Sequence, residues 1–166
     1  MTQRCVVFSH GQDGEPWGGK IVAMAEVARR LGWRVESVDY RGMPDPQVRV
    51  TKLLDYCQPL QGPLVLVGSS MGGHVAAAVS AQVPTHGLFL LAPAFFMPGY
   101  EQYTPVPATC PVEIVHGWND DIVPPQNSIR FAQQYRSHLH LLDSDHRLTA
   151  HIGPICELFE LFLRRL

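Results

Sequence analysis

Short apolar runs alternate with longer segments of helical periodicity along nearly the whole chain, and this alternation constrains the fold more than any other feature. The apolar runs are residues 4–9, 33–38, 64–67, 85–92, 111–115 and 139–142. The segments of helical periodicity between and after them are 17–31, 45–57, 72–82, 125–135 and 153–166. Strands that alternate with helices form βαβ units, whose right-handed crossovers place helices on both faces of a parallel sheet. The sequence therefore predicts an α/β fold, a three-layer sandwich with about six mainly parallel strands.

Length and composition limit the domain organisation and the partners. A chain of 166 residues suffices for one hydrophobic core, so residues 1–166 are expected to form a single domain. The net charge of -2 favours neither nucleic acid nor an anionic membrane as a partner. No apolar run approaches the roughly 18 residues that span a bilayer, and the first residues lack the pattern of a signal peptide.

Four cysteines are spread widely along the chain: Cys5, Cys57, Cys110 and Cys156. Their spacing matches neither a metal-ligand set nor the dense framework of a small disulfide-rich domain. We therefore expect reduced, mostly buried thiols, no metal site and a cytoplasmic location.

The pattern Gly68-Ser69-Ser70-Met71-Gly72 joins an apolar strand to a helix of small residues. A Gly-x-Ser-x-Gly sequence at such a junction is typical of a nucleophile elbow, in which a strained turn exposes the serine hydroxyl. Ser69 is similar in type, but only Ser70 lies between the two glycines at a spacing of two. The alternative interpretation is a tight glycine turn with a capping serine. The sequence favours Ser70 as a nucleophile.

A serine hydroxyl needs a base to take its proton and an acid to orient that base. In elbow enzymes these groups follow in the order serine, acid, histidine. Asp120 and Asp121 both follow the next-to-last strand and compete for the role of the acid. Either aspartate alone could equally be a solvated loop carboxylate or a helix cap.

His146 follows the last strand and is the candidate base. His151 could substitute for it but lies deeper in the expected final helix. His138 and His140 precede or occupy the last strand, so we expect them at the surface or the sheet edge.

A tetrahedral intermediate needs backbone N–H groups that bind its oxyanion. Met71 follows the nucleophile at the start of a helix and supplies one donor. The loop after the first strand supplies the second, with Gln12 N–H preferred and Gly11 as the alternative. His10 in the same loop is expected to be structural.

Taken in order, these motifs resemble the α/β-hydrolase superfamily. Its four landmarks match His10-Gly11, the 68–72 elbow, residues 116–124 and Asp145-His146. The family pattern places the acid three residues before a Val-Pro pair, here Val123-Pro124, which selects Asp120 over Asp121. Residues 8–17 resemble small dienelactone-hydrolase-like or carboxylesterase-like members.

The resemblance also has departures. The chain starts at what would be the third strand of typical members, so the N-terminal hairpin is expected to be missing. The usual lid is reduced to the loop 93–109. Its aromatic residues either form a wall of the substrate pocket or pack onto the core. On the first interpretation the loop contributes Phe95, Phe96 and Met97 to the pocket. Trp118, which follows the next-to-last strand, is also expected in the pocket.

The predicted function is a serine hydrolase that cleaves carboxylic ester, thioester or amide bonds of a small-molecule substrate, with no metal or organic cofactor. The alternative is a non-catalytic scaffold that binds a small molecule or a protein. Phosphate-loop and dinucleotide-binding motifs are absent from the sequence. The edge strand 139–142 or the apolar last helix could support a homodimer.

Overall fold

The apolar runs form a parallel sheet in the computed structural model of the chain, which describes residues 2–166. The strands are β1 (Cys5–Ser9), β2 (Arg34–Val38), β3 (Leu64–Ser69), β4 (Gly87–Leu91), β5 (Val112–Gly117) and β6 (His138–Leu142). Within residues 2–166 the sheet has six strands in the order β2-β1-β3-β4-β5-β6, and every neighbouring pair is parallel. The predicted α/β sandwich is confirmed.

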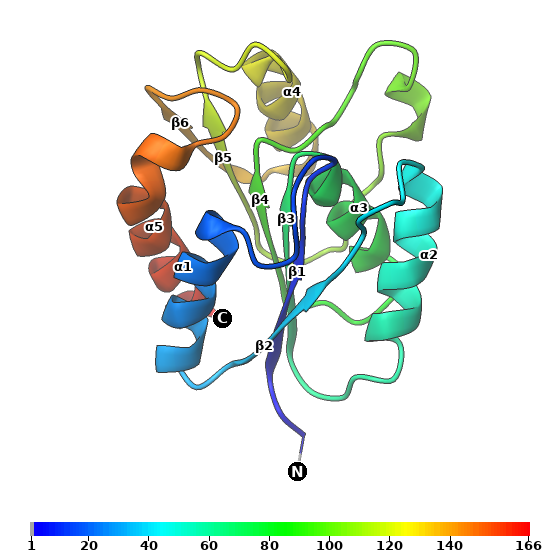
Figure 1. Ribbon diagram of the computed structural model, residues 1–166, viewed down its shortest axis with the longest axis vertical. Helices are drawn as coiled ribbons and strands as arrows, with labels where there is room; N and C mark the ends of the chain where they lie inside the picture. Colours follow the sequence, from blue (N-terminus) through cyan, green and yellow to red (C-terminus); the bar gives the residue numbers. More distant parts are fainter. Residues whose placement is uncertain (1) are drawn as a thin grey trace.

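Helices cover both faces of this sheet (Figure 1). They are α1 (Gly19–Arg30), α2 (Pro46–Cys57), α3 (Met71–Ser80), α4 (Pro125–Tyr135) and α5 (Ile152–Arg165). Helices α1 and α5 pack on one face, whereas α2, α3 and α4 pack on the other. Short 3-10 turns at Glu101–Tyr103 and Thr149–His151 interrupt two of the loops.

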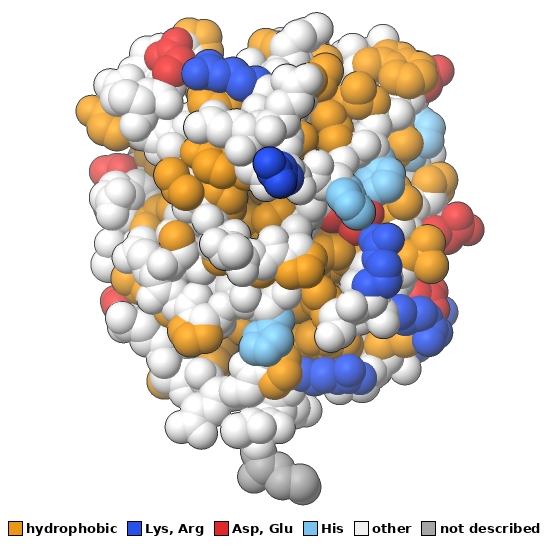
Figure 2. All heavy atoms as spheres, turned by 180° about the vertical axis from the view of Figure 1, so that it is seen from behind, with side chains coloured by type: hydrophobic (Ala, Val, Ile, Leu, Met, Phe, Trp, Pro, Cys, Tyr) orange, Lys and Arg blue, Asp and Glu red, His pale blue; other side chains and the backbone are white. Residues whose placement is uncertain are grey.

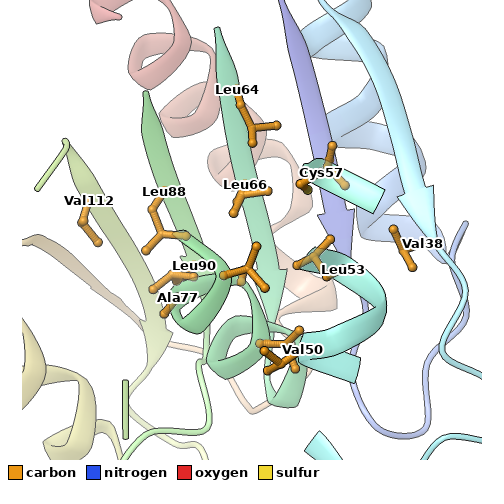
Figure 3. Close-up of a cluster of buried hydrophobic side chains, with 14 of the residues drawn as sticks. Val38, Val50, Leu53, Cys57, Leu64, Leu66, Ala77, Leu88, Leu90 and Val112 are labelled. Atoms are coloured by element: carbon orange, nitrogen blue, oxygen red, sulfur yellow. The ribbon is translucent and has the colours of Figure 1, made fainter. Parts of the chain in front are cut away.

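Each central strand is buried on both faces, which explains its unbroken apolar run. Along β3, Leu64 and Leu66 belong to the core under α2 and α3, while Val65 and Val67 belong to the core under α1 and α5. Figure 3 shows the first of these cores, with side chains from three central strands directed toward helices α2 and α3. Successive side chains of a strand point to opposite faces of the sheet, so one apolar run contributes to two separate hydrophobic cores.

Helix α2 buries one stripe of its surface against the sheet. Val48 lies outside this stripe and is 48% exposed. The buried stripe instead runs through Arg49, Val50, Leu53 and Cys57. These residues are spaced at three or four positions, so an arginine occupies a place on the apolar face.

The chain order of the strands reverses between β1 and β3. The connection after β1 leads outward to β2, and the later strands extend the sheet from the other side of β1. In open α/β sheets, ligands bind outside the carboxyl ends of the strands at such a switch point. The loops after β1 and β3 meet there, and Ser70 lies in the second of these loops.

The surface is mixed in character. On the face opposite to that of Figure 1, apolar side chains are dispersed among uncharged ones, as is usual for globular proteins (Figure 2). In residues 2–166 no helix combines the length and the apolar character that a membrane-spanning segment requires. The thiols of all four cysteines are free, two of them buried and two half-buried.

Candidate active site

Ser70 occupies a strained turn between β3 and α3. Its backbone has φ 54° and ψ -120°, a conformation that residues other than glycine rarely adopt. A methyl group on Gly68 would overlap the Gly72 carbonyl, and one on Gly72 would overlap the Ser9 carbonyl. The two glycines therefore allow the close approach of backbones that this turn requires.

Three side chains from three loops form a continuous hydrogen-bonded chain at Ser70. His146 Nε2 lies 3.0 Å from Ser70 Oγ, and His146 Nδ1 lies 2.7 Å from Asp120 Oδ2. Because an ionised carboxylate only accepts, Nδ1 carries the proton and Nε2 is free to accept one from the serine hydroxyl. The His146 side chain is 18% exposed and that of Asp120 is fully buried. The hydrogen bonds thus connect the accessible hydroxyl of Ser70 to the buried carboxylate of Asp120.

Further donors hold the Asp120 carboxylate in place. Its Oδ1 accepts hydrogen bonds from the N–H groups of Ile122 at 2.9 Å and Val123 at 2.8 Å. Asp121 is exposed and borders the cavity described below, rather than contacting His146. Of the two neighbouring aspartates, the structure therefore brings Asp120 to the imidazole.

A second imidazole, that of His116 at the end of β5, also contacts Asp120. Its Nε2 lies 3.0 Å from Asp120 Oδ2 and 2.9 Å from the Val123 carbonyl oxygen. Its Nδ1 lies 2.7 Å from Ser128 Oγ. Burial lowers the pKa of His116, so the neutral ring donates from Nε2 and accepts the Ser128 hydroxyl at Nδ1. No role for His116 was predicted from the sequence, where it directly follows the apolar run 111–115.

The other histidines considered as the base, His138, His140 and His151, make no hydrogen bond to Ser70 among the described residues. His151 belongs to the 3-10 turn just before α5. His138 and His140 lie on the edge strand β6, and His140 Nε2 lies 2.6 Å from an oxygen of the buried Glu113. His146 is the imidazole that the structure brings to the serine.

The loop after β1 passes beside Ser70. A methyl group on Gly11 would lie 3.5 Å from the Ser70 Cβ. Among the hydrogen bonds of residues 2–166, neither Gln12 N–H nor Met71 N–H donates to a protein acceptor. Both N–H groups are therefore unpaired among the described residues, and Met71 is the first residue of α3, where the helix dipole favours negative charge.

Arg49 on α2 holds this loop in place, a role that was not predicted from the sequence. Its buried guanidinium donates to the carbonyl oxygens of His10 at 3.1 Å, Gly11 at 3.1 Å and Gln12 at 3.3 Å. The Gly11 carbonyl and the Gln12 N–H belong to the same peptide unit, so the arginine fixes the direction of that N–H. A charged residue four positions before Leu53, on the apolar stripe of α2, was the signal in the sequence.

His10 completes the support of the loop. Its Nε2 accepts the Tyr40 N–H at 2.8 Å, and its Nδ1 lies 2.8 Å from the Gly11 carbonyl oxygen. Burial lowers the pKa of His10, which keeps the ring neutral. These contacts give His10 a structural role in the loop.

A cavity of about 870 Å³ lies against Ser70 and His146. It is lined by the loop after β1, the start of α1, the end of β3, and parts of the loops that carry Asp121 and His146. Within residues 2–166, no cluster of three or more His, Cys, Asp or Glu side chains is arranged to hold a metal ion.

The aromatic residues expected to form the pocket wall do not line this cavity, which corrects the first interpretation of loop 93–109. Phe95 is fully buried and stacks on Phe131 of α4 with ring centroids 4.0 Å apart. The Arg130 guanidinium lies over the Phe96 ring, with its Cζ 3.9 Å from the ring centroid. Met97 is half-buried, and Trp118 is 55% exposed.

Hydrogen bonds explain why the loop folds this way. Asn127 Nδ2 on α4 donates to the Phe95 carbonyl at 2.8 Å, and Thr104 Oγ1 accepts the Phe96 N–H at 2.9 Å. The loop is therefore held against α4, with Phe95 in the core and Phe96 packed against it, whereas Tyr100 and Tyr103 are exposed.

Comparisons of the sequence and of the structure with known proteins both identify the alpha/beta hydrolase family. A sequence model of the alpha/beta hydrolase family matches residues 6–159. A protein of the alpha/beta hydrolase superfamily from Xanthomonas campestris pv. campestris is 36% identical, with a TM-score of 0.91 and 99% of both chains covered. Est1E from Butyrivibrio proteoclasticus has the same fold, with a TM-score of 0.84 and 21% identity over 99% of this chain and 88% of its own.

Among curated proteins, the chain is similar to the mitochondrial palmitoyl-protein thioesterase ABHD10 of Mus musculus. The two are 24% identical over an alignment that covers 78% of this chain and 63% of the relative. The match thus spans less than two thirds of the relative's length.

Proposed function

The chain belongs to the α/β hydrolase family, and from this premise we propose that it is a serine hydrolase that cleaves carboxylic esters of small molecules through an acyl-enzyme on Ser70. The observation that supports this most is the hydrogen-bonded chain from Ser70 Oγ through His146 to the buried Asp120 carboxylate. It starts at a strained turn at the carboxyl end of β3. The order serine, acid, histidine along the chain is the one that elbow enzymes use.

In the first half of the reaction, Ser70 Oγ attacks the carbonyl carbon of the ester. His146 Nε2 takes the hydroxyl proton as the new C–O bond forms. Asp120 stabilises the resulting imidazolium and keeps its ring in orientation. The imidazolium then gives the proton to the leaving alkoxide as its bond to the carbonyl carbon breaks.

Negative charge develops on the carbonyl oxygen during this step. The N–H groups of Met71 and Gln12 are the proposed donors to that oxygen, and neither has a protein acceptor among the described residues. Fixed donors of this kind stabilise the transition state because they need no reorganisation when the charge appears.

In the second half, a water molecule attacks the acyl-enzyme. His146 accepts a proton from this water and returns it to Ser70 Oγ when the acyl group leaves as a carboxylic acid. The hydroxyl and the neutral imidazole are thereby restored.

Thioesters are the second candidate substrate class. The observation in their favour is the 24% identity to a palmitoyl-protein thioesterase. The same residues would act, with a thiolate in place of an alkoxide as the leaving group. Rates on an oxygen ester and a thioester with the same acyl group would rank the two classes.

The test is a panel of p-nitrophenyl esters of increasing acyl length, assayed with wild type and with Ser70→Ala. Removal of the nucleophile should reduce turnover by about 10⁴-fold or more. Ser69→Ala is the matched control, because it leaves the hydrogen bond between Ser70 and His146 in place, and its effect should be far smaller. Equal turnover by wild type and Ser70→Ala would favour the non-catalytic scaffold instead.

A further inference from the structure

The cavity beside Ser70 contains a lysine ammonium that forms no ion pair with a carboxylate in the part of the chain that the structure describes. Lys20 lies in the first turn of α1 and lines the cavity together with Ser70 and His146. Its Nζ lies 3.4 Å from Ser69 Oγ, and in residues 2–166 this is its one side-chain hydrogen bond. Ser69 adjoins the nucleophile, so a positive charge is located close to the reacting serine.

This charge is poorly compensated by the protein. Burial lowers the pKa of Lys20 to about 8, which is the direction expected when an ammonium loses hydration. The charge of Asp145 opposes this shift, and that of Arg147 adds to it. At neutral pH the side chain is nevertheless protonated, because its pKa lies above 7. A desolvated cation without a direct counter-ion is stabilised by an anion that binds next to it.

The other cations of the cavity differ from Lys20. Arg41 pairs with Asp39, its Nη2 lying 2.8 Å from a carboxylate oxygen. Arg147 is exposed to solvent, which screens its charge. Lys20 is thus the cavity cation that is both sheltered from water and without a direct acidic partner.

The acidic residues of the cavity lie where solvent weakens their influence. All four are exposed: Asp13, Glu15, Asp121 and Asp145. One oxygen of the Asp145 carboxylate, Oδ1, also accepts hydrogen bonds from two backbone N–H groups of its own loop, each at 3.1 Å. Interactions among exposed charges are worth little in water, whereas a contact to a sheltered ammonium is not screened in this way.

We propose that Lys20 recognises a carboxylate carried by the substrate, so that the enzyme prefers monoanionic esters over neutral esters of similar size. The inference rests on the proposed hydrolase function and names the class of ester on which that function acts. Lys20 is the specificity determinant, and Ser69 helps to hold its ammonium.

Two substrate pairs test this proposal. The first pair is mono-p-nitrophenyl adipate and p-nitrophenyl heptanoate, in which the carboxylate lies on the acyl side. The second is p-acetoxybenzoate and p-acetoxybenzamide, in which it lies on the leaving group. The readout is the ratio of kcat/KM for the anionic ester to that for its neutral partner, which compares two substrates on the same enzyme sample and so cancels any loss of folded protein.

Wild type should favour the anionic ester in at least one pair by about 10- to 100-fold, as a hydrogen bond to a charged group supplies. Lys20→Met should bring this ratio close to one. Lys52→Met is the matched control, because Lys52 lies on α2 and its Nζ donates to the Asp39 carbonyl oxygen at 2.6 Å, outside the cavity lining. This variant should keep the wild-type ratio.

The ratio should also depend on pH in a defined direction. The ammonium is charged below its pKa of about 8, so the preference should be full at lower pH and fall as the pH rises through 8. Substrate carboxylates stay ionised over this range. Lys20→Met should show no such fall. The charged or titratable groups that share the cavity with Lys20 are His10, Asp13, Glu15, Arg41, Asp121, Asp145, His146 and Arg147.

Three results would overturn the inference. One is equal turnover of anionic and neutral esters by wild type in both pairs, and another is a preference that survives in Lys20→Met. In either case the hydrolase function itself would stand. Absence of turnover with all four esters would instead overturn the proposed function and this inference together.

Discussion

Two loops flank the elbow strand β3, and they differ in what they do with their side chains. The loop after β1 is polar and rich in glycine; its backbone borders the cavity and is held from below by Arg49. The loop after β4 is rich in proline and aromatic residues; Phe95 enters the core and the loop lies against α4. Both follow strands that pair directly with β3.

The difference shows why aromatic content was a poor guide to the site. A large apolar side chain gains more free energy from full burial than from an exposed cavity wall, so Phe95 packs against Phe131. Glycines and polar residues leave backbone N–H groups accessible, and such groups are what a ligand oxygen needs. The polar loops should therefore govern turnover, and the apolar loop should govern stability.

The largest effect on turnover is expected on the polar side, at the acid. Asp120→Asn should lower kcat by about 10⁴-fold, because an amide cannot hold the imidazole with its proton on Nδ1. Asp121→Asn, the neighbouring change, should cost far less, because Asp121 is exposed and does not contact His146. Steady-state kinetics on one activated ester compares the two, and a larger loss in Asp121→Asn would reverse the assignment.

Arg49→Met should have the next largest effect. Loss of the guanidinium frees the Gly11–Gln12 peptide unit, and kcat should fall by about 10²-fold while KM changes little, as when an oxyanion donor is displaced. Arg130→Met is the matched control, since Arg130 contacts Phe96 of the other loop. Kinetics should be normalised to folded enzyme by circular dichroism. A loss confined to KM, or an equal loss in Arg130→Met, would contradict the proposed role.

On the apolar side, Phe95→Ala should act on stability. Deletion of a buried ring leaves a cavity against Phe131, and the free energy of unfolding should fall by about 3–5 kcal/mol. Activity per folded molecule should change only a few-fold. Denaturant unfolding together with kinetics measures both quantities, and a large specific loss of activity at unchanged stability would return Phe95 to the substrate pocket.

The smallest effect is expected for Trp118→Ser. Trp118 is 55% exposed and does not line the cavity. Both the free energy of unfolding, within about 0.5 kcal/mol, and kcat/KM should be close to wild type. A strong rise in KM for aromatic esters would show that the indole contacts substrate after all.

The fold class could be predicted from the sequence because strands and helices have different hydrophobic periodicities, and the two patterns alternate along this chain. It also indicated Ser70, His146 and one of the pair Asp120 and Asp121, because each follows a strand and parallel strands bring their carboxyl ends to one edge of the sheet. The family resemblance selected Asp120 from that pair. Ser70 could be distinguished from Ser69 by its place between Gly68 and Gly72, and the crowding at these two positions explains why both are glycines.

Other features depend on tertiary placement that spacing alone does not determine. Arg49 and Val48 differ by one position on α2, and one residue of helix rotation decides which is buried. Lys20 flanks the apolar stripe of α1, so its approach to Ser69 depends on how α1 meets the sheet. His116 directly follows the apolar run 111–115, and nothing in that run indicates whether its imidazole contacts a carboxylate.

The central claim is that Ser70 is an activated nucleophile, and covalent labelling tests it most directly. The wild-type protein would be incubated with a fluorophosphonate at neutral pH and its peptides analysed by mass spectrometry. One adduct per chain is expected, on the peptide that contains Ser70, with no adduct in Ser70→Ala and slow labelling in Asp120→Asn. An unlabelled Ser70, or equal labelling of Ser70→Ala at another residue, would contradict the account.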